Sequence, residues 1–306
     1  MTQKSLSPRA WAELALLALI WGGIFLSVRV ALDEIGVATV VAHRVFWAAL
    51  ILWGVVLVRG LEIPKGWRTW GAFLMMGILN NALPYALMAW GQLHIESGLT
   101  SILNAATALF GVAVAAAVFR DERLTARRVA GVAIGFAGVV LAIGPEALLR
   151  FDLRSLGQIA VLGGAFSYAL AGAWGRKTLS HLPPLTAAAG MLTGAALFAV
   201  PAAFWLDGAP QASLAPRTFA ALAYAAVIGT AFAYLLYFRV LAMAGSGNLL
   251  LTTLLIPPVA ILLGAWVLDE TLPRRALAGF LVLAAGLAIL DGRVLRMARR
   301  PQHPRP

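Results

Sequence analysis

Polar and aromatic residues interrupt the apolar stretches of this chain at corresponding places in its two halves. Asn80-Asn81 is followed by Pro84-Tyr85, and in the second half Gly229-Thr230 is followed at the same spacing by Ala233-Tyr234. Amides and hydroxyls in apolar surroundings need hydrogen-bond partners, which a polar ligand or water can provide. Aromatic faces stack on planar groups and attract ammonium groups. The pattern therefore predicts a binding cavity to which both halves contribute.

Further residues extend this correspondence: Asn104 matches Thr253, and Trp21 matches Tyr168. Prolines add free backbone carbonyls, because a proline removes a helical hydrogen bond. The residues expected to line the cavity are Trp21, Asn80, Asn81, Pro84, Tyr85, Asn104, Thr107, Tyr168, Thr230, Tyr234, Thr253 and Pro257. A plainer interpretation stays open for each of them. Polar residues in membrane helices often bond their own backbone or a neighbouring helix, and Trp or Tyr near helix ends often anchors at the membrane interface.

Ionisable residues within the apolar segments are scarce, and the candidates for a proton or charge site are Glu13, His43 and Arg44. Glu13 falls in the first turn of its segment, where the helix dipole favours a carboxylate. His43 belongs to the residue type that titrates near neutral pH. We expect Arg44 to extend outward to the lipid headgroups. Because no Asp or Glu lies at mid-segment, we expect no strict coupling to protons through a buried carboxylate.

An intramembrane enzyme is the alternative from a different class. Gly245-Ser246-Gly247 resembles a nucleophile motif only superficially, and the histidines of the second half are His181 and His303. The chain has no cysteine and no intramembrane aspartate pair. We therefore expect no catalytic residues, no metal and no cofactor.

The composition is that of a membrane protein, with 306 residues of which 61% are hydrophobic and 12% charged. Soluble domains carry about twice that share of charge. Apolar runs near the length of a membrane span recur throughout. They fall at 11–31, 37–58, 69–92, 98–118, 126–144, 156–176, 184–206, 218–241, 247–267 and 274–291. We predict an all-α integral membrane protein with ten transmembrane helices, the first of them retained rather than cleaved as a signal peptide.

The basic residues indicate an orientation. With a cytoplasmic N-terminus, 17 Lys and Arg fall inside and six outside, with Arg44 left within a helix. This bias favours both termini in the cytoplasm. Since the excess of charge, +11, sits at helix ends and in the tail, we expect no nucleic-acid partner.

An internal duplication divides the chain. Residues 121–144 and 269–292 share an Asp-Glu pair, a Leu, an Arg, Ala-Gly twice and a final Gly. We expect a first five-helix repeat at 1–148, a second at 149–292 and a basic, disordered tail at 293–306. Five helices are an odd number, so the second repeat must be inverted relative to the first. Small residues should let segments 126–144 and 274–291 pack together, namely Gly131, Gly135, Gly138, Gly279 and Gly286.

Trp21-Gly22-Gly23, the run Ala244–Gly286 and its echo at Asp121 resemble the EamA-type exporters of the drug/metabolite transporter superfamily. The likeness covers essentially the whole chain, and its most specific part includes Pro257, Glu270 and Gly279. It implies ten helices in two inverted five-helix repeats and the export of amino acids, metabolites or toxic compounds. The amino-acid exporters, including those for aromatic amino acids, are the most similar. Where the family often has a proline in the fourth helix this chain has Leu109 or Phe110, so no proline accounts for a helix break there.

Together these features predict an exporter of the inner (cytoplasmic) membrane that works by alternating access through a central cavity. Its partners would be a small-molecule substrate and the lipid bilayer, and it would act as a monomer or homodimer. Organic cations remain an alternative substrate class, because they suit an aromatic lining. Nucleotide sugars would need several basic residues in the cavity, and only Arg44 is available.

Overall fold

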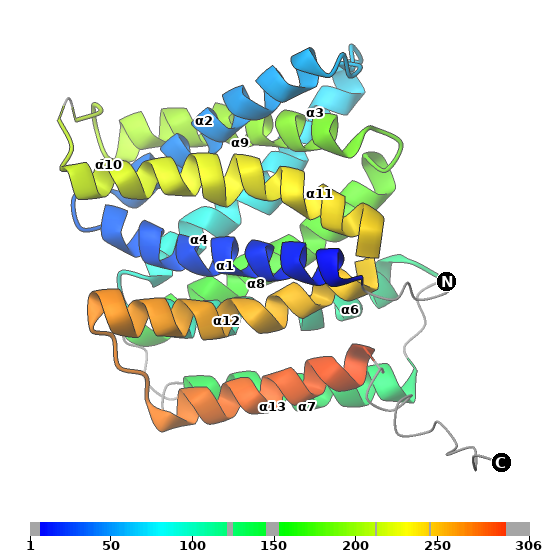
Figure 1. Cartoon of the computed structure of the whole chain (residues 1–306), viewed down its shortest axis with the longest axis vertical. Helices are drawn as coiled ribbons and strands as arrows, with labels where there is room; N and C mark the ends of the chain where they lie inside the picture. The colour runs from blue at the N-terminus through cyan, green and yellow to red at the C-terminus, as the bar shows by residue number, and fades with distance from the viewer. Residues whose placement is uncertain (1–6, 121–124, 145–152, 212, 245, 292–306) are drawn as a thin grey trace.

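The computed structural model describes residues 7–120, 125–144, 153–211, 213–244 and 246–291. The regular secondary structure of these residues is helical, with no strand (Figure 1). In the first half the helices are α1 (Pro8–Ala31), α2 (Val37–Val58), α3 (Trp67–Gly77), η1 (Ile78–Ala82), α4 (Leu83–Gly91), α5 (Ser97–Asn104), α6 (Thr107–Val118) and α7 (Ala126–Ile143). In the second they are α8 (Leu153–Thr178), α9 (Pro184–Leu206), α10 (Pro216–Ala223), η3 (Tyr224–Phe232), α11 (Ala233–Ala244), α12 (Ser246–Leu268) and α13 (Arg274–Asp291).

The predicted all-α class is confirmed. Within the described residues, 8 helical segments are long and apolar enough to cross a membrane, and Thr252–Leu268 is a shorter apolar helix. Each apolar run named from the sequence coincides with one helix or with a continuous series of helices. The count of ten spans stays a prediction. The hairpin turn at Asp121 and the tail from 293 lie outside the described residues.

Local sequence explains where several helices begin. The Ser7 hydroxyl accepts a hydrogen bond from the Ala10 N–H at 3.2 Å, and Pro8 occupies the first turn of α1. Thr125 caps α7 in the same way, accepting from the Arg128 N–H at 3.3 Å. A hydroxyl at the N-cap satisfies a backbone N–H that has no partner within the helix. Proline suits the first turn because it lacks an N–H.

Helices α7 and α13 pack against each other in antiparallel directions along one edge of the bundle (Figure 1). Gly131 faces Gly286 and Leu290, whereas Gly138 faces Gly279 and Leu283. A Cβ atom on Gly138 would run into the Leu283 backbone, so only glycine permits this approach. The predicted pairing of these two helices is confirmed.

Helices α2 and α9 form a second antiparallel pair at the opposite edge (Figure 1). The Thr39 hydroxyl at the start of α2 donates to Asp207 at the end of α9, at 2.8 Å. In turn, the Thr186 hydroxyl near the start of α9 donates to the Glu62 carbonyl beyond the end of α2, at 3.3 Å. Reciprocal contacts of this kind arise when a two-fold axis relates two elements. The inverted repeat and its boundaries stay predictions.

Three helical spans depart from regular α-helix. Two of them contain π-helical turns, η1 between α3 and α4 and η3 between α10 and α11. The α5–α6 span breaks at Ala105-Ala106, although it has no proline there. Tight i→i+3 bonds hold the break, such as Ala106 N–H to Leu103 C=O at 3.0 Å. Helix α12, by contrast, continues through Pro257-Pro258. The positions of proline therefore do not predict where the α5–α6 span breaks.

Candidate functional site

Six side chains from both halves meet in the interior, and we call them the central cluster: Arg44, Asn80, Asn81, Tyr85, Thr230 and Tyr234. They come from α2, η1 and α4 in the first half and from η3 and α11 in the second. The cluster thus joins the repeat-related residues Asn81 and Thr230, and Tyr85 and Tyr234. Their assembly follows from the packing of α2 and α4 against each other and of α2 against η3.

Arg44 is the cation of the central cluster. Its Nε donates to the Thr230 hydroxyl at 3.0 Å, and its guanidinium carbon lies 3.6 Å from the centre of the Tyr85 ring. Its exposed fraction is only 9%. The expectation that this side chain extends to the headgroups is therefore wrong. The hydroxyl and the aromatic face offset part of the cost of burying the charge, and so hold the guanidinium inside.

The asparagines of η1 bond to tyrosines of both halves. Asn81 Nδ2 donates to Tyr85 Oη at 2.9 Å and to Tyr234 Oη at 3.3 Å. Asn80 Nδ2 donates to Tyr234 Oη at 3.1 Å. Asn81 is fully buried, and its Oδ1 has no hydrogen-bond partner in the described part of the chain. A buried acceptor without a partner is costly unless a ligand or water supplies a donor.

The π-helical turns carry Asn80, Asn81 and Thr230 of the central cluster. The Thr230 hydroxyl donates to the Ala225 carbonyl at 2.8 Å, and the Ser167 hydroxyl from α8 donates to the Leu79 carbonyl of η1 at 2.7 Å. Such turns occur frequently at functional sites. Sequence reasoning missed Ser167, although its position directly before Tyr168 in an apolar helix was an available signal.

The other expected cavity residues lie on the surrounding helices. Tyr168 packs against the apolar residues around Tyr85, whereas Trp21 contacts the Tyr237 ring at 5.8 Å. Thr107 and Asn104 flank the α5–α6 break, with the Thr107 hydroxyl 3.5 Å from Asn104 Oδ1. Pro84 is buried on α4, and α12 carries the buried Pro257 and the half-buried Thr253. Whether these residues line one cavity stays a prediction.

Glu13 has ion-pair partners and His43 has a hydrogen-bond partner. Glu13 on α1 pairs with Arg239 on α11 and with Arg9 one turn earlier. His43 Nδ1 accepts from Trp47 Nε1 at 3.1 Å, and the ring lines a small surface hollow with Thr39 and Asp207. Their roles as proton sites remain untested predictions.

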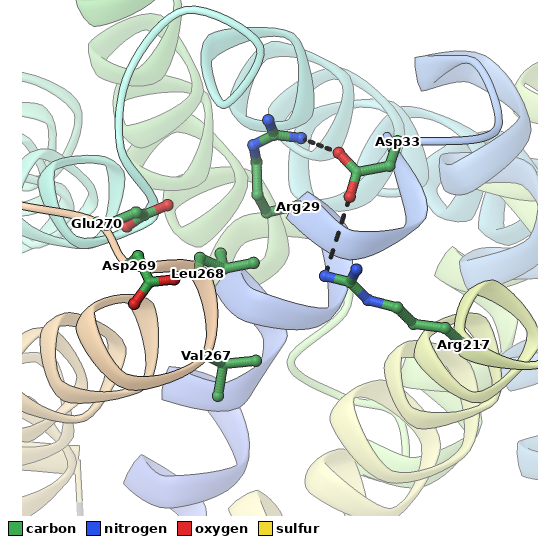
Figure 2. A pocket seen from close by; sticks show the side chains of 7 residues that line it. All are labelled: Arg29, Asp33, Arg217, Val267, Leu268, Asp269 and Glu270. Carbon is green, nitrogen blue, oxygen red and sulfur yellow. Dashed lines mark hydrogen bonds and ion pairs between the residues drawn. The ribbon is translucent and has the colours of Figure 1, made fainter.

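A hollow of about 340 Å³ opens at the end of the bundle where α1 and α12 finish and α10 begins (Figure 2). Asp33 lies between two arginines there, 2.7 Å from Arg29 and 4.0 Å from Arg217. The hollow's lining residues are Arg29, Asp33, Arg217, Val267, Leu268, Asp269 and Glu270. None of them belongs to the central cluster, so this hollow is a separate feature of the surface.

Three carboxylates join the halves at this same end. Glu270 accepts from the Ser97 N–H at 3.0 Å and from the Ser97 hydroxyl at 2.7 Å, at the start of α5. Asp207 accepts from the Thr39 N–H at 2.7 Å, and Glu34 from the Ala215 N–H at 3.0 Å. A carboxylate on a helix N-terminus satisfies free N–H groups and interacts favourably with the helix dipole. We call these contacts the three carboxylate caps, and each of them joins the two halves at this end of the bundle.

Comparison with known proteins identifies the family. The model of the EamA-like transporter family matches residues 10–144 and again residues 155–290. The chain belongs to this family. The "Probable terminal-alkyne amino-acid exporter" of Streptantibioticus cattleyicolor is 27% identical over 302 residues, covering 98% of each chain. The "Probable amino-acid metabolite efflux pump" of Salmonella typhimurium is 30% identical over 216 residues, covering 67% of this chain and 71% of that one.

A solved crystal structure supports the same fold, with a TM-score of 0.68 over 95% of this chain and 99% of the other, at 16% identity. Membership of the EamA-like family indicates a multi-pass membrane transporter rather than an enzyme. It also implies a small-molecule substrate and a lipid bilayer around the helices.

Proposed function

We propose that this chain exports small metabolites, and amino acids above all, across the inner membrane by alternating access. In this proposal ten spans form two inverted repeats with both termini in the cytoplasm. The start of α1 and the end of α13 lie at the same end of the bundle, as an even number of crossings requires (Figure 1). The substrate binds between the repeats.

The central cluster is the observation that carries the proposal. Buried polar side chains from both halves meet on widened helical turns, and Asn81 Oδ1 has no partner within the described residues. Inverted-repeat carriers bind their substrates at the interface of the repeats, beside irregular helices. Irregular backbone at membrane depth persists only where protein or a water-filled cavity surrounds it.

The chemistry of the central cluster favours amino acids over organic cations. Tyr85, Tyr168 and Tyr234 would suit either class, because aromatic faces attract ammonium groups. The guanidinium of Arg44 repels a substrate whose only charge is positive. Two relatives carry names that refer to amino-acid export. Organic cations are therefore the weaker candidate.

Counterflow in proteoliposomes tests the proposal. Vesicles are preloaded with an unlabelled amino acid, labelled tryptophan or threonine is added outside, and the pH gradient is varied. We expect uptake that depends on the preload and is insensitive to the gradient, because the central cluster contains no carboxylate. Exchange of no amino acid would contradict the proposed substrate, and uptake that follows the gradient would contradict facilitative transport.

Tyr234→Phe links this transport to the central cluster. It removes the hydroxyl that accepts from Asn80 and Asn81, so the substrate concentration at half-maximal exchange should rise about tenfold. Tyr237→Phe is the matched control, because Tyr237 lies on the same helix and contacts the rings of Trp21 and Phe238. Equal effects of the two substitutions would place the binding site elsewhere.

A further inference from the structure

Arg44 is buried without a carboxylate partner in the described part of the chain. A guanidinium carries five N–H donors. Among the described residues only its Nε donates a hydrogen bond, to Thr230, and its guanidinium carbon lies over the Tyr85 ring. The terminal nitrogens Nη1 and Nη2 are therefore left for another acceptor.

An anionic ligand would complete this arrangement. A guanidinium binds a carboxylate through two parallel N–H···O bonds in its own plane. The contact with the Tyr85 ring, 3.6 Å from the guanidinium carbon, uses none of its N–H groups in a hydrogen bond to a carboxylate. Burial strengthens such a pair, because an unpaired charge in apolar surroundings is costly. Arg44 thus fits a carboxylate better than it fits a neutral or cationic group.

Asn81 offers a hydrogen-bond acceptor, which is the group that an ammonium needs, and it contacts the same tyrosine as Arg44. Its Nδ2 donates to Tyr85 Oη and to Tyr234 Oη, which leaves Oδ1 as a buried acceptor without a partner. An ammonium group is a donor that this oxygen can accept. Arg44 and Asn81 both contact one side chain, that of Tyr85, with Arg44 at the ring and Asn81 at the hydroxyl.

We propose that Arg44 and Asn81 bind the two charged poles of a zwitterionic substrate. Arg44 receives the carboxylate through its terminal nitrogens, and Asn81 Oδ1 accepts a hydrogen bond from the ammonium. This assignment rests on the proposed export of amino acids, and it names the groups by which an amino acid is distinguished from an amine. The substrate's own side chain is then free to contact the tyrosines of the central cluster.

Four ligands with one indole side chain test the assignment: tryptophan, tryptophan amide, tryptamine and indole-3-propionate. A corresponding threonine series covers a smaller side chain. Each is added to the detergent-solubilised protein and the shift in melting temperature is measured, then each competes with the labelled amino acid in counterflow. We expect stabilisation and competition from ligands with a carboxylate. The amide and the amine should need about tenfold higher concentrations or more.

Substitutions test which residue binds the carboxylate of the substrate and which binds its ammonium group. Arg44→Gln should abolish the preference for the carboxylate over the amide, and Arg44→Lys should retain part of it, because lysine keeps the charge but loses the planar fork. Asn81→Leu should abolish the preference for tryptophan over indole-3-propionate. Arg59→Gln is the matched control, since it removes an exposed arginine at the end of the same helix. It should leave both preferences unchanged.

The inference and the proposed function can fail independently, and different results would contradict each of them. Amino-acid exchange in which the amide competes as well as the acid, or in which Arg44→Gln keeps the preference, would overturn the inference and leave the export function standing. Absence of exchange with any amino acid would contradict the export function. Even without exchange, a shift in melting temperature with indole-3-propionate that is lost in Arg44→Gln would support the carboxylate site. No shift from any carboxylate would overturn it.

Discussion

Arg44 and Thr230 form one of the side-chain contacts that join the two halves at the centre. The Thr230 hydroxyl accepts from Arg44 and donates to the Ala225 carbonyl. It therefore satisfies a buried cation and a π-helical turn at once. A methyl group in its place can do neither.

Thr230→Val tests this double role. The substitution keeps the shape but leaves a buried Arg44 N–H without an acceptor, at a cost of about 1–3 kcal/mol. We expect a lower melting temperature in detergent and roughly five- to a hundredfold weaker substrate binding, both restored by Thr230→Ser. Thr178→Val is the control, since that hydroxyl donates to the carbonyl of Trp174 within the same helix. An unchanged melting temperature and affinity in Thr230→Val would contradict the role.

At the scale of residues, the sequence predicted which polar residues lie together but not which contacts they make. Repeat correspondence selected Asn81 with Thr230 and Tyr85 with Tyr234, and the structure brings all four residues together. The position of Arg44 was predicted wrongly. A long basic side chain within a helix can turn either way, and only the partners offered by η3 and α4 decide its direction.

At the scale of elements, the pair α7 and α13 depends on close backbone approach. Gly138→Ala adds a methyl group that meets the Leu283 backbone. Overpacking of this kind costs about 1–3 kcal/mol. We expect a clear drop in melting temperature. Gly111→Ala on α6 meets no atom within 4 Å, so it should be neutral or slightly stabilising, because alanine favours helix. Equal effects of the two would contradict the close packing.

The cap on α5 gives a second prediction. Glu270→Gln removes the charge that Ser97 and Gly98 bond through their N–H groups, a loss of about 0.5–2 kcal/mol. If the three carboxylate caps hold this end closed, the loss favours opening there. A single cysteine at Ser101, buried one turn below, should then react faster with a thiol reagent.

The cap experiment has little background, because the chain has no cysteine of its own. Glu62→Gln, an exposed position at the opposite end, serves as the charge control and should leave the Ser101→Cys reaction unchanged. A rate that Glu270→Gln does not alter would mean that the cap contributes to stability without controlling access.

Helix positions were predictable because apolar runs of membrane length have few alternative structures. The irregular turns were not. In η1 a neighbouring helix bonds the backbone, because the Ser167 hydroxyl of α8 donates to the Leu79 carbonyl. Such partners are distant in sequence, and no local pattern of residues announces them.

At the scale of the whole molecule, the antiparallel pairs α7–α13 and α2–α9 lie at opposite edges (Figure 1). The central cluster joins side chains of the two halves. In the proposed alternating access, the two halves rock about a fixed central site and expose it to each side in turn. The three carboxylate caps all lie at one end, where they join the halves. Under this proposal, opening at that end would break them.

Accessibility of one central position from both sides of the membrane tests this account most directly. Asn80→Cys puts a thiol in the central cluster, and small impermeant thiol reagents are applied from either side of vesicles of known orientation. The account predicts modification from both sides, slowed from both by bound substrate. Modification from one side only, or modification that substrate does not slow, would contradict a shared central site with alternating access.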